Sequence, residues 1–169
     1  MALEFTGAPI SDSSGNLLFY TNGVWIADAS NDTMQNGNGL NRSSYTTSVY
    51  NTSIRVTGAD VVLPDPGNIN QYYLIHETPG DIDTPFPDYI YYSLINKTLN
   101  NGLGVVTVKN QILVADTLLL GQKNVCRHAN GRDWWVMLLY TTKLNSGCYF
   151  VKVTSDFGAT QTKRLMILK

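Results

Sequence analysis

The chain has 169 residues, of which 43% are hydrophobic and 15% are charged, and its formal net charge is −1. This length predicts one domain, because domains hold roughly 100–200 residues. The balanced charge argues against a basic face for nucleic acid and against a polybasic membrane contact. No stretch reaches the ~18–20 apolar residues that a membrane-spanning helix needs. The composition therefore favours a packed domain that binds no nucleic acid and inserts into no membrane.

One pattern occurs three times: a turn containing glycine, a short apolar or aromatic strand, a second turn and another strand. The copies begin near Gly15, Gly67 and Gly131, and Tyr73 and Trp135 hold equivalent places in the last two copies. A repeated unit of this length with several short strands is typical of β-propeller blades. The sequence therefore predicts an all-β fold of consecutive four-stranded antiparallel blades, an incomplete β-propeller.

The first unit is expected at about residues 8–57. Asp12 to Asn16 has the composition of a tight turn, and Leu17 to Thr21 of a strand. Asn22-Gly23 predicts a two-residue hairpin turn before the returning strand. Residues 35–53 are rich in Asn, Gly, Ser and Thr, and we expect a long surface connection there.

The second and third units are expected at about 58–116 and 120–169. We expect no helix in any unit, because Gly and Asn recur too often and no stripe of period 3.6 persists. The strands predicted for the second unit lie near 61–63, 72–77, 89–95 and 105–114, and those for the third near 124–128, 133–141, 148–154 and 162–168.

Two cysteines, Cys126 and Cys148, fall on the predicted first and third strands of the last unit. Strands that are not neighbours lie too far apart for a disulfide, since adjacent strands are already ~5 Å apart. We therefore expect two small buried thiols without a bridge, and no metal site, because no CxxC or HxxxH spacing occurs.

Five stretches in order along the chain carry a resemblance to a known family. The sharpest runs from Arg127 to Val136 and reads RHANGRDWWV; the others are residues 10–23, 34–40, 63–67 with 72–73, and 98–104. With these motifs the chain resembles the N-terminal β-propeller region of large secreted and surface proteins of bacteria that use type IX secretion. The resemblance implies a segment of two to three blades and a secreted or cell-surface location. It carries over no catalytic residue.

The chain departs from that family at its beginning, where Met1 to Phe5 contain neither the basic nor the long apolar region of a signal peptide. Either the protein is cytoplasmic, or its signal was removed or lies upstream; the resemblance favours the second. We also expect that the open faces of the outer units pack against remaining propeller blades or another copy of the chain.

The densest polar cluster consists of Arg127, His128, Asn130, Arg132 and Asp133. In a functional interpretation these residues bind a ligand, or His128 is a general base that Asp133 orients. In a structural interpretation, which we favour, Asn130-Gly131 forms a hairpin turn and the charged side chains bond to nearby backbone. The sequence supplies no nucleophile or oxyanion hole for this cluster.

Two further sets of residues are weaker candidates for binding. Asp81, Asp83 and Asp88 offer oxygen ligands for calcium, but their spacing does not match a calcium loop and a plain exposed loop is favoured. Aromatic side chains could stack on a sugar ring, although adjacent aromatics on a strand point to opposite faces and packing is the default. The aromatic candidates for contact are Tyr72, Tyr91 and Trp134.

Together these features predict a non-catalytic segment that acts in binding, adhesion or display, without a cofactor, on a carbohydrate or protein ligand. One alternative is a glycoside hydrolase or another propeller enzyme, which requires two carboxylates within ~5–10 Å in a cleft. A second alternative is a structural spacer in a long adhesin, which predicts no concave pocket.

Overall fold

The computed structural model describes residues 6–79, 89–115, 118–140, 148–153 and 161–163. Its elements confirm the predicted all-β class, since strands far outnumber helices. The first four strands are β1 (Ile10–Ser11), β2 (Leu17–Thr21), β3 (Trp25–Asp28) and β4 (Thr33–Asn38). The next four are β5 (Asp60–Asp65), β6 (Asn68–His76), β7 (Tyr89–Asn96) and β8 (Val105–Ala115). The last four are β9 (Leu118–Arg127), β10 (Trp134–Tyr140), β11 (Cys148–Val153) and β12 (Gln161–Lys163).

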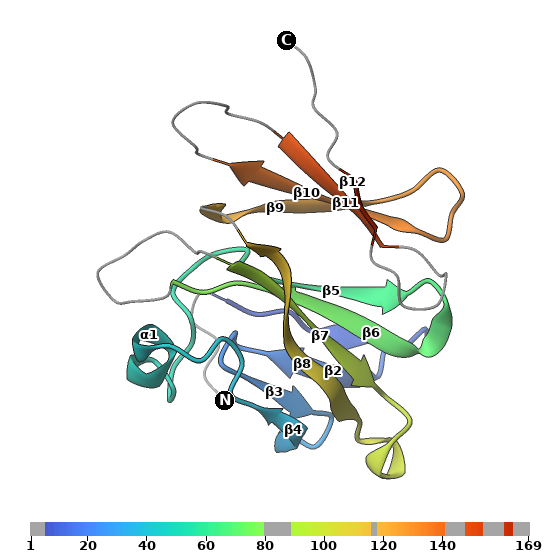
Figure 1. Ribbon diagram of the computed structural model, residues 1–169. Coiled ribbons are helices and arrows are strands. Elements are labelled where there is room, and N and C mark those ends of the chain that lie inside the picture. The colour runs from blue at the N-terminus through green and yellow to red at the C-terminus, as the bar shows by residue number, and fades with distance from the viewer. Residues whose placement is uncertain (1–5, 80–88, 116–117, 141–147, 154–160, 164–169) are drawn as a thin grey trace.

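Within each of these three groups, consecutive strands pair antiparallel, as the turn signals between them predict. The first two groups are also joined, because β4 and β8 run parallel and pair at Gln35 and Val105. Eight strands therefore form one nearly closed, barrel-like sheet in the order β1-β2-β3-β4-β8-β7-β6-β5. Strands β9 to β12 form a separate four-stranded sheet that lies against β5 to β8 (Figure 1).

The β2–β3 hairpin forms where Asn22-Gly23 predicted it. The Asn22 side-chain oxygen accepts hydrogen bonds from the backbone N–H groups of Val24 (3.0 Å) and Trp25 (3.1 Å). Gly23 has a φ of +84°, and a Cβ on it would lie 2.6 Å from Ile54 Cδ1. Glycine is thus required both by the backbone conformation and by the close approach of Ile54.

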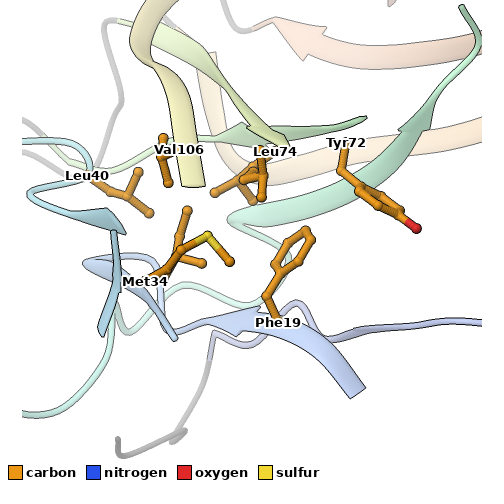
Figure 2. Packing of buried hydrophobic residues seen from close by; sticks show 8 residues of the cluster. Phe19, Met34, Leu40, Tyr72, Leu74 and Val106 are labelled. Carbon is orange, nitrogen blue, oxygen red and sulfur yellow. The ribbon is translucent and has the colours of Figure 1, made fainter. Parts of the chain in front are cut away.

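The second half of β6, residues 72–76, is buried on both sides of the sheet. Along β6 the side chains alternate, so Tyr73 and Ile75 face one side while Tyr72 and Leu74 face the other. The first side packs against Val136 and Leu138 of β10, and the second against the β2–β4 layer. Figure 2 shows this second core, in which Phe19, Met34, Leu40, Tyr72, Leu74 and Val106 meet.

A short helix, α1 (Ser44–Ser48), lies in the segment that we expected to be a surface connection without a helix, so that expectation was wrong. The Ser43 Oγ accepts a hydrogen bond from the Thr46 backbone N–H (3.1 Å), and Thr46 Oγ1 accepts one from the Ser43 N–H (2.9 Å). This reciprocal capping box starts a helix that is too short to show a 3.6-residue stripe. A 3₁₀ turn, η1 (Asn100–Gly102), is the second helical element of the described residues. Among the described residues, neither helix is long and apolar enough to cross a membrane.

Cys126 is a free and exposed thiol, so the prediction that it is buried was wrong. Its neighbour Val125 packs against the core, and alternation along β9 turns Cys126 to the opposite face. Strands β9 and β11 both pair with β10, as expected, and therefore Cys126 and Cys148 do not lie on adjacent strands.

Candidate functional site

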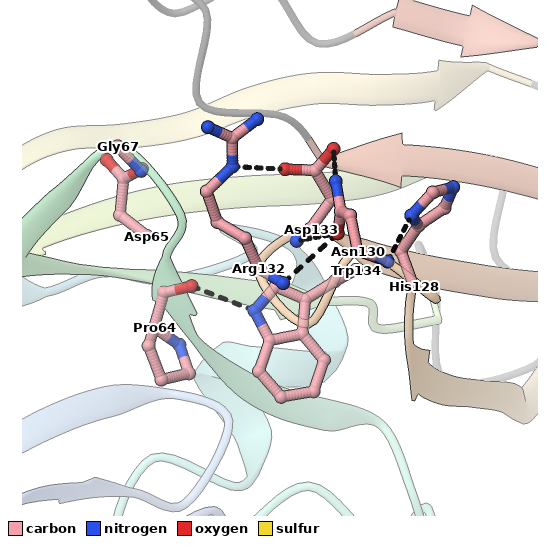
Figure 3. A network of polar contacts seen from close by, with 8 residues as sticks. All are labelled: Pro64, Asp65, Gly67, His128, Asn130, Arg132, Asp133 and Trp134. Atoms are coloured by element: carbon pink, nitrogen blue, oxygen red, sulfur yellow. Dashed lines mark hydrogen bonds and ion pairs between the residues drawn. The ribbon is translucent and has the colours of Figure 1, made fainter.

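The cluster that stands out in the sequence forms the β9–β10 turn, where its members bond chiefly to one another (Figure 3). The Asn130 side-chain oxygen accepts hydrogen bonds from the backbone N–H groups of Arg132 (3.1 Å) and Asp133 (3.0 Å). The His128 N–H donates to the Asp133 carbonyl (2.8 Å), which closes the turn, and Gly131 has a φ of +71°. The geometry therefore agrees with the structural interpretation of this cluster.

The arrangement of His128 and Asp133 does not fit a general base with an orienting carboxylate. His128 Nδ1 accepts a hydrogen bond from the Asn130 N–H (3.1 Å), so this nitrogen carries no proton to donate. The Asp133 carboxylate accepts hydrogen bonds from the Asn130 side-chain amide (2.9 Å) and from Arg132 Nε (3.2 Å). The Asp133 carboxylate is therefore bonded to other residues of the turn and not to the His128 imidazole.

Trp134 joins this turn to the β5–β8 layer. Its indole Nε1 donates to the Pro64 carbonyl (3.1 Å), and its ring packs at the margin of the core between the two sheets. The Arg127 guanidinium lies 4.9 Å from the centre of a ring of this indole, within the range of a cation–π contact. Trp134 therefore packs one layer on the next, and Arg127 contacts its ring from the neighbouring strand of the same sheet.

The other two aromatic candidates also pack against protein. Tyr72 is only 7% exposed, and its ring meets the Phe19 ring edge-on with centroids 5.5 Å apart. It cannot contact a ligand in this structure, because the second half of β6 is covered on both sides of the sheet, which buries Tyr72 as well as Tyr73. Tyr91 is half-buried and stacks on the imidazole of His76 at 5.8 Å.

The three aspartates proposed for calcium, Asp81, Asp83 and Asp88, lie outside the described residues. Within the described part of the chain, no group of three or more His, Cys, Asp or Glu side chains is placed to hold a metal ion. The carboxylate of Asp12 accepts hydrogen bonds from the backbone N–H groups of Ser14 (2.8 Å) and Asn16 (2.9 Å). A hydrogen bond from the Asn16 side-chain amide (3.0 Å) is the main cause that lowers the pKa of Asp12, and the two backbone bonds lower it further.

A buried polar network lies between β6, β7, β8 and the loop that follows β4. His76 is fully buried, with Nδ1 2.7 Å from Asn41 Oδ1 and Nε2 2.9 Å from Ser93 Oγ. The Asn110 side chain accepts a hydrogen bond from the Asn41 N–H (3.2 Å) and donates one to the Gly39 carbonyl (3.0 Å). The loop that leads into α1 is thus fastened to the middle layer at two successive points.

One protonation pattern satisfies every member of this network. The Asn41 side-chain amide nitrogen donates a hydrogen bond to the Gly23 carbonyl. Its Oδ1 therefore accepts a hydrogen bond from the protonated Nδ1 of His76. Ser93 Oγ accepts a hydrogen bond from the Asn110 N–H (3.1 Å), and its hydroxyl can donate a hydrogen bond to the unprotonated Nε2 of His76. His76 is then neutral, in keeping with burial, which with nearby Lys123 lowers its pKa to about 3.

Above this network, a hollow of about 550 Å³ opens between the end of β4 and α1. Buried Val24 and Leu40 contribute its apolar surface, and exposed Arg42, Thr47 and Tyr50 contribute a cation, a hydroxyl and an aromatic ring. Ligand pockets typically have volumes of ~300–1,000 Å³ with a few polar groups on an apolar lining. We refer to this feature as the α1 hollow, and it is the candidate binding site of the described residues.

The α1 hollow has a positive electrostatic character. Its lining contains Arg42 and no acidic residue. Behind it, the Lys109 ammonium donates to the carbonyl oxygens of Asn36 (3.1 Å) and Asn38 (2.8 Å). Partial burial lowers the pKa of Lys109, and the charge of Arg42 lowers it further.

A second buried polar group lies between the β5–β8 layer and β9. The Glu77 carboxylate accepts hydrogen bonds from the Gly121 N–H (2.6 Å) and the Lys123 ammonium (2.8 Å), and both charged side chains are almost fully buried. Both carboxylate oxygens of Asp60 are closed to solvent, and no hydrogen-bond partner for them lies among the described residues. Burial, with the charge of Glu77, raises the pKa of Asp60 to about 7.

Sequence reasoning did not find the α1 hollow or the network beneath it. The network's members are separated by up to 71 residues, and no motif links them. Two local signals were present: the Ser-x-x-Thr spacing of a capping box at Ser43, and Asn at positions 41 and 110, where φ is +51° and +55°. Asparagine tolerates this left-handed conformation better than most residues.

Comparison of the chain with known protein families, with curated proteins and with solved structures found no match.

Proposed function

We propose that this protein is a non-catalytic, ligand-binding segment of a secreted or cell-surface protein, and that its stacked four-stranded units correspond to blades of an incomplete β-propeller. The packing of side chains on each side of β6 against a neighbouring group of strands supports the second part, while the pairing of β4 with β8 joins the first two groups into one sheet and departs from separate blades. The outer units would then pack against further blades or a second copy of the chain. The localisation rests on the family resemblance in the sequence.

The observation that carries the binding role is the α1 hollow. It combines an apolar base with an arginine, hydroxyl groups and an exposed aromatic ring, which are groups that hold a ligand. None of the residues that line it is an aspartate, glutamate, histidine, lysine or cysteine. It therefore offers recognition without the usual general acids and bases of catalysis.

The glycoside hydrolase alternative needs a pair of carboxylates in an accessible cleft. Asp60 and Glu77 do come close enough to affect one another electrostatically, and the raised pKa of Asp60 suits a general acid. Their oxygens, however, are buried, and Glu77 is held by Lys123 and the Gly121 backbone. This closed arrangement favours a packing role over catalysis.

The adhesin-spacer alternative predicts a surface without a concave site, and the α1 hollow counts against it. Immobilised protein tested against a panel of neutral and acidic polysaccharides and of host matrix proteins distinguishes the three functions. A binding segment retains at least one of these ligands unchanged. Release of new reducing ends from a retained glycan would contradict the non-catalytic proposal, and failure to retain any ligand would favour the spacer.

A further inference from the structure

We propose that the α1 hollow binds a carboxylate-bearing sugar, a uronic acid residue of a glycan, with Arg42 as the group that recognises the carboxylate. The proposal rests on the binding function proposed above and specifies its ligand class. Three independent features of the hollow point to this chemistry: its charge, its aromatic ring and its polar side chains.

The charge argument concerns the partners of Arg42. Among the described residues the two ion pairs are Lys123–Glu77 and Arg132–Asp133, so no described carboxylate pairs with Arg42. A guanidinium offers a planar pair of N–H donors that matches a carboxylate. Lys109 adds a second positive charge nearby, since its ammonium donates to the carbonyl of Asn38, which lines the hollow. The hollow is therefore suited to one anionic group and unsuited to a cation.

The position of Arg42 is set by the backbone beside it. Gly39 has a φ of +75°, and a Cβ at this residue would lie 3.0 Å from Arg42 Nε. The side chain thus lies directly over the Gly39 backbone, whose carbonyl is held by Asn110. The buried network beneath the hollow orders this loop before any ligand arrives, which lowers the entropic cost of binding.

The aromatic ring and polar groups suit the rest of a sugar. Tyr50 lines the hollow and is 43% exposed, so an aromatic ring is accessible there to the apolar face of a sugar ring. Thr47 Oγ1 donates to the Ser43 carbonyl (2.9 Å) and keeps its lone pairs for sugar hydroxyls. The exposed Asn38 amide adds donors and an acceptor. Among anionic sugars we commit to a uronate, whose planar carboxylate accepts two parallel N–H groups of a guanidinium.

The test uses short oligogalacturonate and the same oligomer with its carboxyl groups reduced, measured by isothermal titration calorimetry. Oligogalacturonate should bind and the reduced oligomer should bind about tenfold more weakly or worse, a difference of ~1.4 kcal/mol. R42Q should lose the same factor for oligogalacturonate and bind the reduced oligomer as the parent protein does. R42K should recover part of the loss, and Y50A should weaken both ligands.

R55Q is the matched control, because Arg55 is also exposed but does not line the hollow. The melting temperature of each variant checks that the fold is kept. Equal binding of the two oligomers, an equal loss in R55Q, or tighter Arg42-dependent binding of a sulfated glycan would each overturn the uronate proposal. If neutral glycans or matrix proteins bind independently of Arg42, the uronate proposal fails while the binding function stands. If no ligand of any class binds, both fail.

Discussion

The network around His76 and the turn around Asn130 are both rich in polar side chains, but they hold the molecule together in different ways. In the network, hydrogen bonds join residues 17 to 71 positions apart in the sequence. In the turn, the side-chain bonds join residues one to three positions apart. The first therefore fixes how distant segments meet, and the second fixes only the path of the chain between two strands.

The difference also appears in burial. His76 has no exposed surface and Asn41 is 3% exposed, whereas Arg132 has more than half of its side chain in solvent. A buried polar group that loses its partner pays a desolvation penalty, while an exposed one exchanges its partner for water. The α1 hollow stands on the network, so its shape depends on buried bonds, and the predictions below test that dependence.

The largest loss of stability is expected for replacement of His76, and replacement of His128 is the comparison. His76→Leu leaves the Asn41 side-chain oxygen and the Ser93 hydroxyl without their partner in a buried site. We expect a loss of about 3–5 kcal/mol in the free energy of unfolding. His128→Leu removes one hydrogen bond in a partly exposed turn and should cost less than about 1 kcal/mol. Urea unfolding of both variants measures the difference.

The comparison would be wrong if both variants lost the same stability. His76→Leu should also impair ligand binding at the α1 hollow in the fraction that remains folded, because Asn41 and the loop after β4 are released. His128→Leu should leave binding unchanged. A stable His76→Leu protein with full binding would show that the loop is ordered without His76, by α1 and by the bonds from Asn110.

A second test compares buried polar groups with and without partners through their pH dependence. Asp60 has a pKa of about 7 in the folded protein and 3.8 as its ordinary value, so its neutral form stabilises the fold below pH 3.8. That contribution is lost as the pH rises from 3.8 through 7. Asp60→Asn should therefore stabilise the protein by about 1–3 kcal/mol at pH 8 and leave it nearly unchanged at pH 3.5.

His76 has the opposite linkage, because its pKa is lowered from 6.5 to about 3. Its contribution is present above pH 6.5 and is lost as the pH falls toward 3. On acidification of the parent protein from pH 6.5 to 4, Asp60 raises the free energy of unfolding while His76 lowers it, so the two effects partly cancel. In Asp60→Asn only the effect of His76 remains, and the free energy of unfolding should fall steadily through this range. Urea midpoints in steps across the range decide the matter, and parallel curves for the two proteins would refute the assignment to Asp60.

The strands could be predicted because their determinants are local. Tyr72 to His76 and Trp134 to Tyr140 are short apolar runs bounded by turn residues, and both form strands near the predicted bounds. The Asn22-Gly23 turn followed from glycine's backbone freedom alone. The exposed face of Cys126 was missed because cysteine is usually a buried residue, although Cys126 shares its face with exposed Asn124 and alternates with core-facing Val125.

The candidate site could not be predicted in the same way. Asn41, His76 and Asn110 each look unremarkable in the sequence, and their meeting depends on the parallel contact of β4 with β8 and on the packing of the layers. In contrast, the polar residues from His128 to Asp133 stand out in the sequence because a tight turn requires local hydrogen bonds among neighbouring residues. Polar residues dense in sequence were thus satisfied locally, and the buried network came from scattered ones.

Trp134 connects the local turn to the rest of the fold, and its replacement tests whether the turn has any long-range role. Trp134→Ala removes a half-buried indole at the margin of the core and the hydrogen bond to Pro64 (3.1 Å). We expect a loss of about 2–3 kcal/mol, below the ~3–5 kcal/mol of a fully buried tryptophan. Trp134→Phe keeps most of the ring and should cost about 1 kcal/mol. Equal melting of Trp134→Ala and the parent would mean that the two layers do not depend on this contact.

The smallest effects should lie within the turn itself. The Asn130 side chain accepts two backbone hydrogen bonds and donates one to Asp133, so Asn130→Ala should cost about 1 kcal/mol. Arg132 bonds to Asp133 through a side chain that is 56% exposed, and such an ion pair contributes ~0.2–1 kcal/mol, less at high salt. Arg132→Ala should therefore lie at or below Asn130→Ala, and its effect should shrink in 1 M salt while that of Asn130→Ala persists. If Arg132→Ala lost more stability than Asn130→Ala and this loss shrank in salt, the turn would be held mainly by the Arg132–Asp133 ion pair. The hydrogen bonds from the backbone to the Asn130 side chain would then be the weaker contribution.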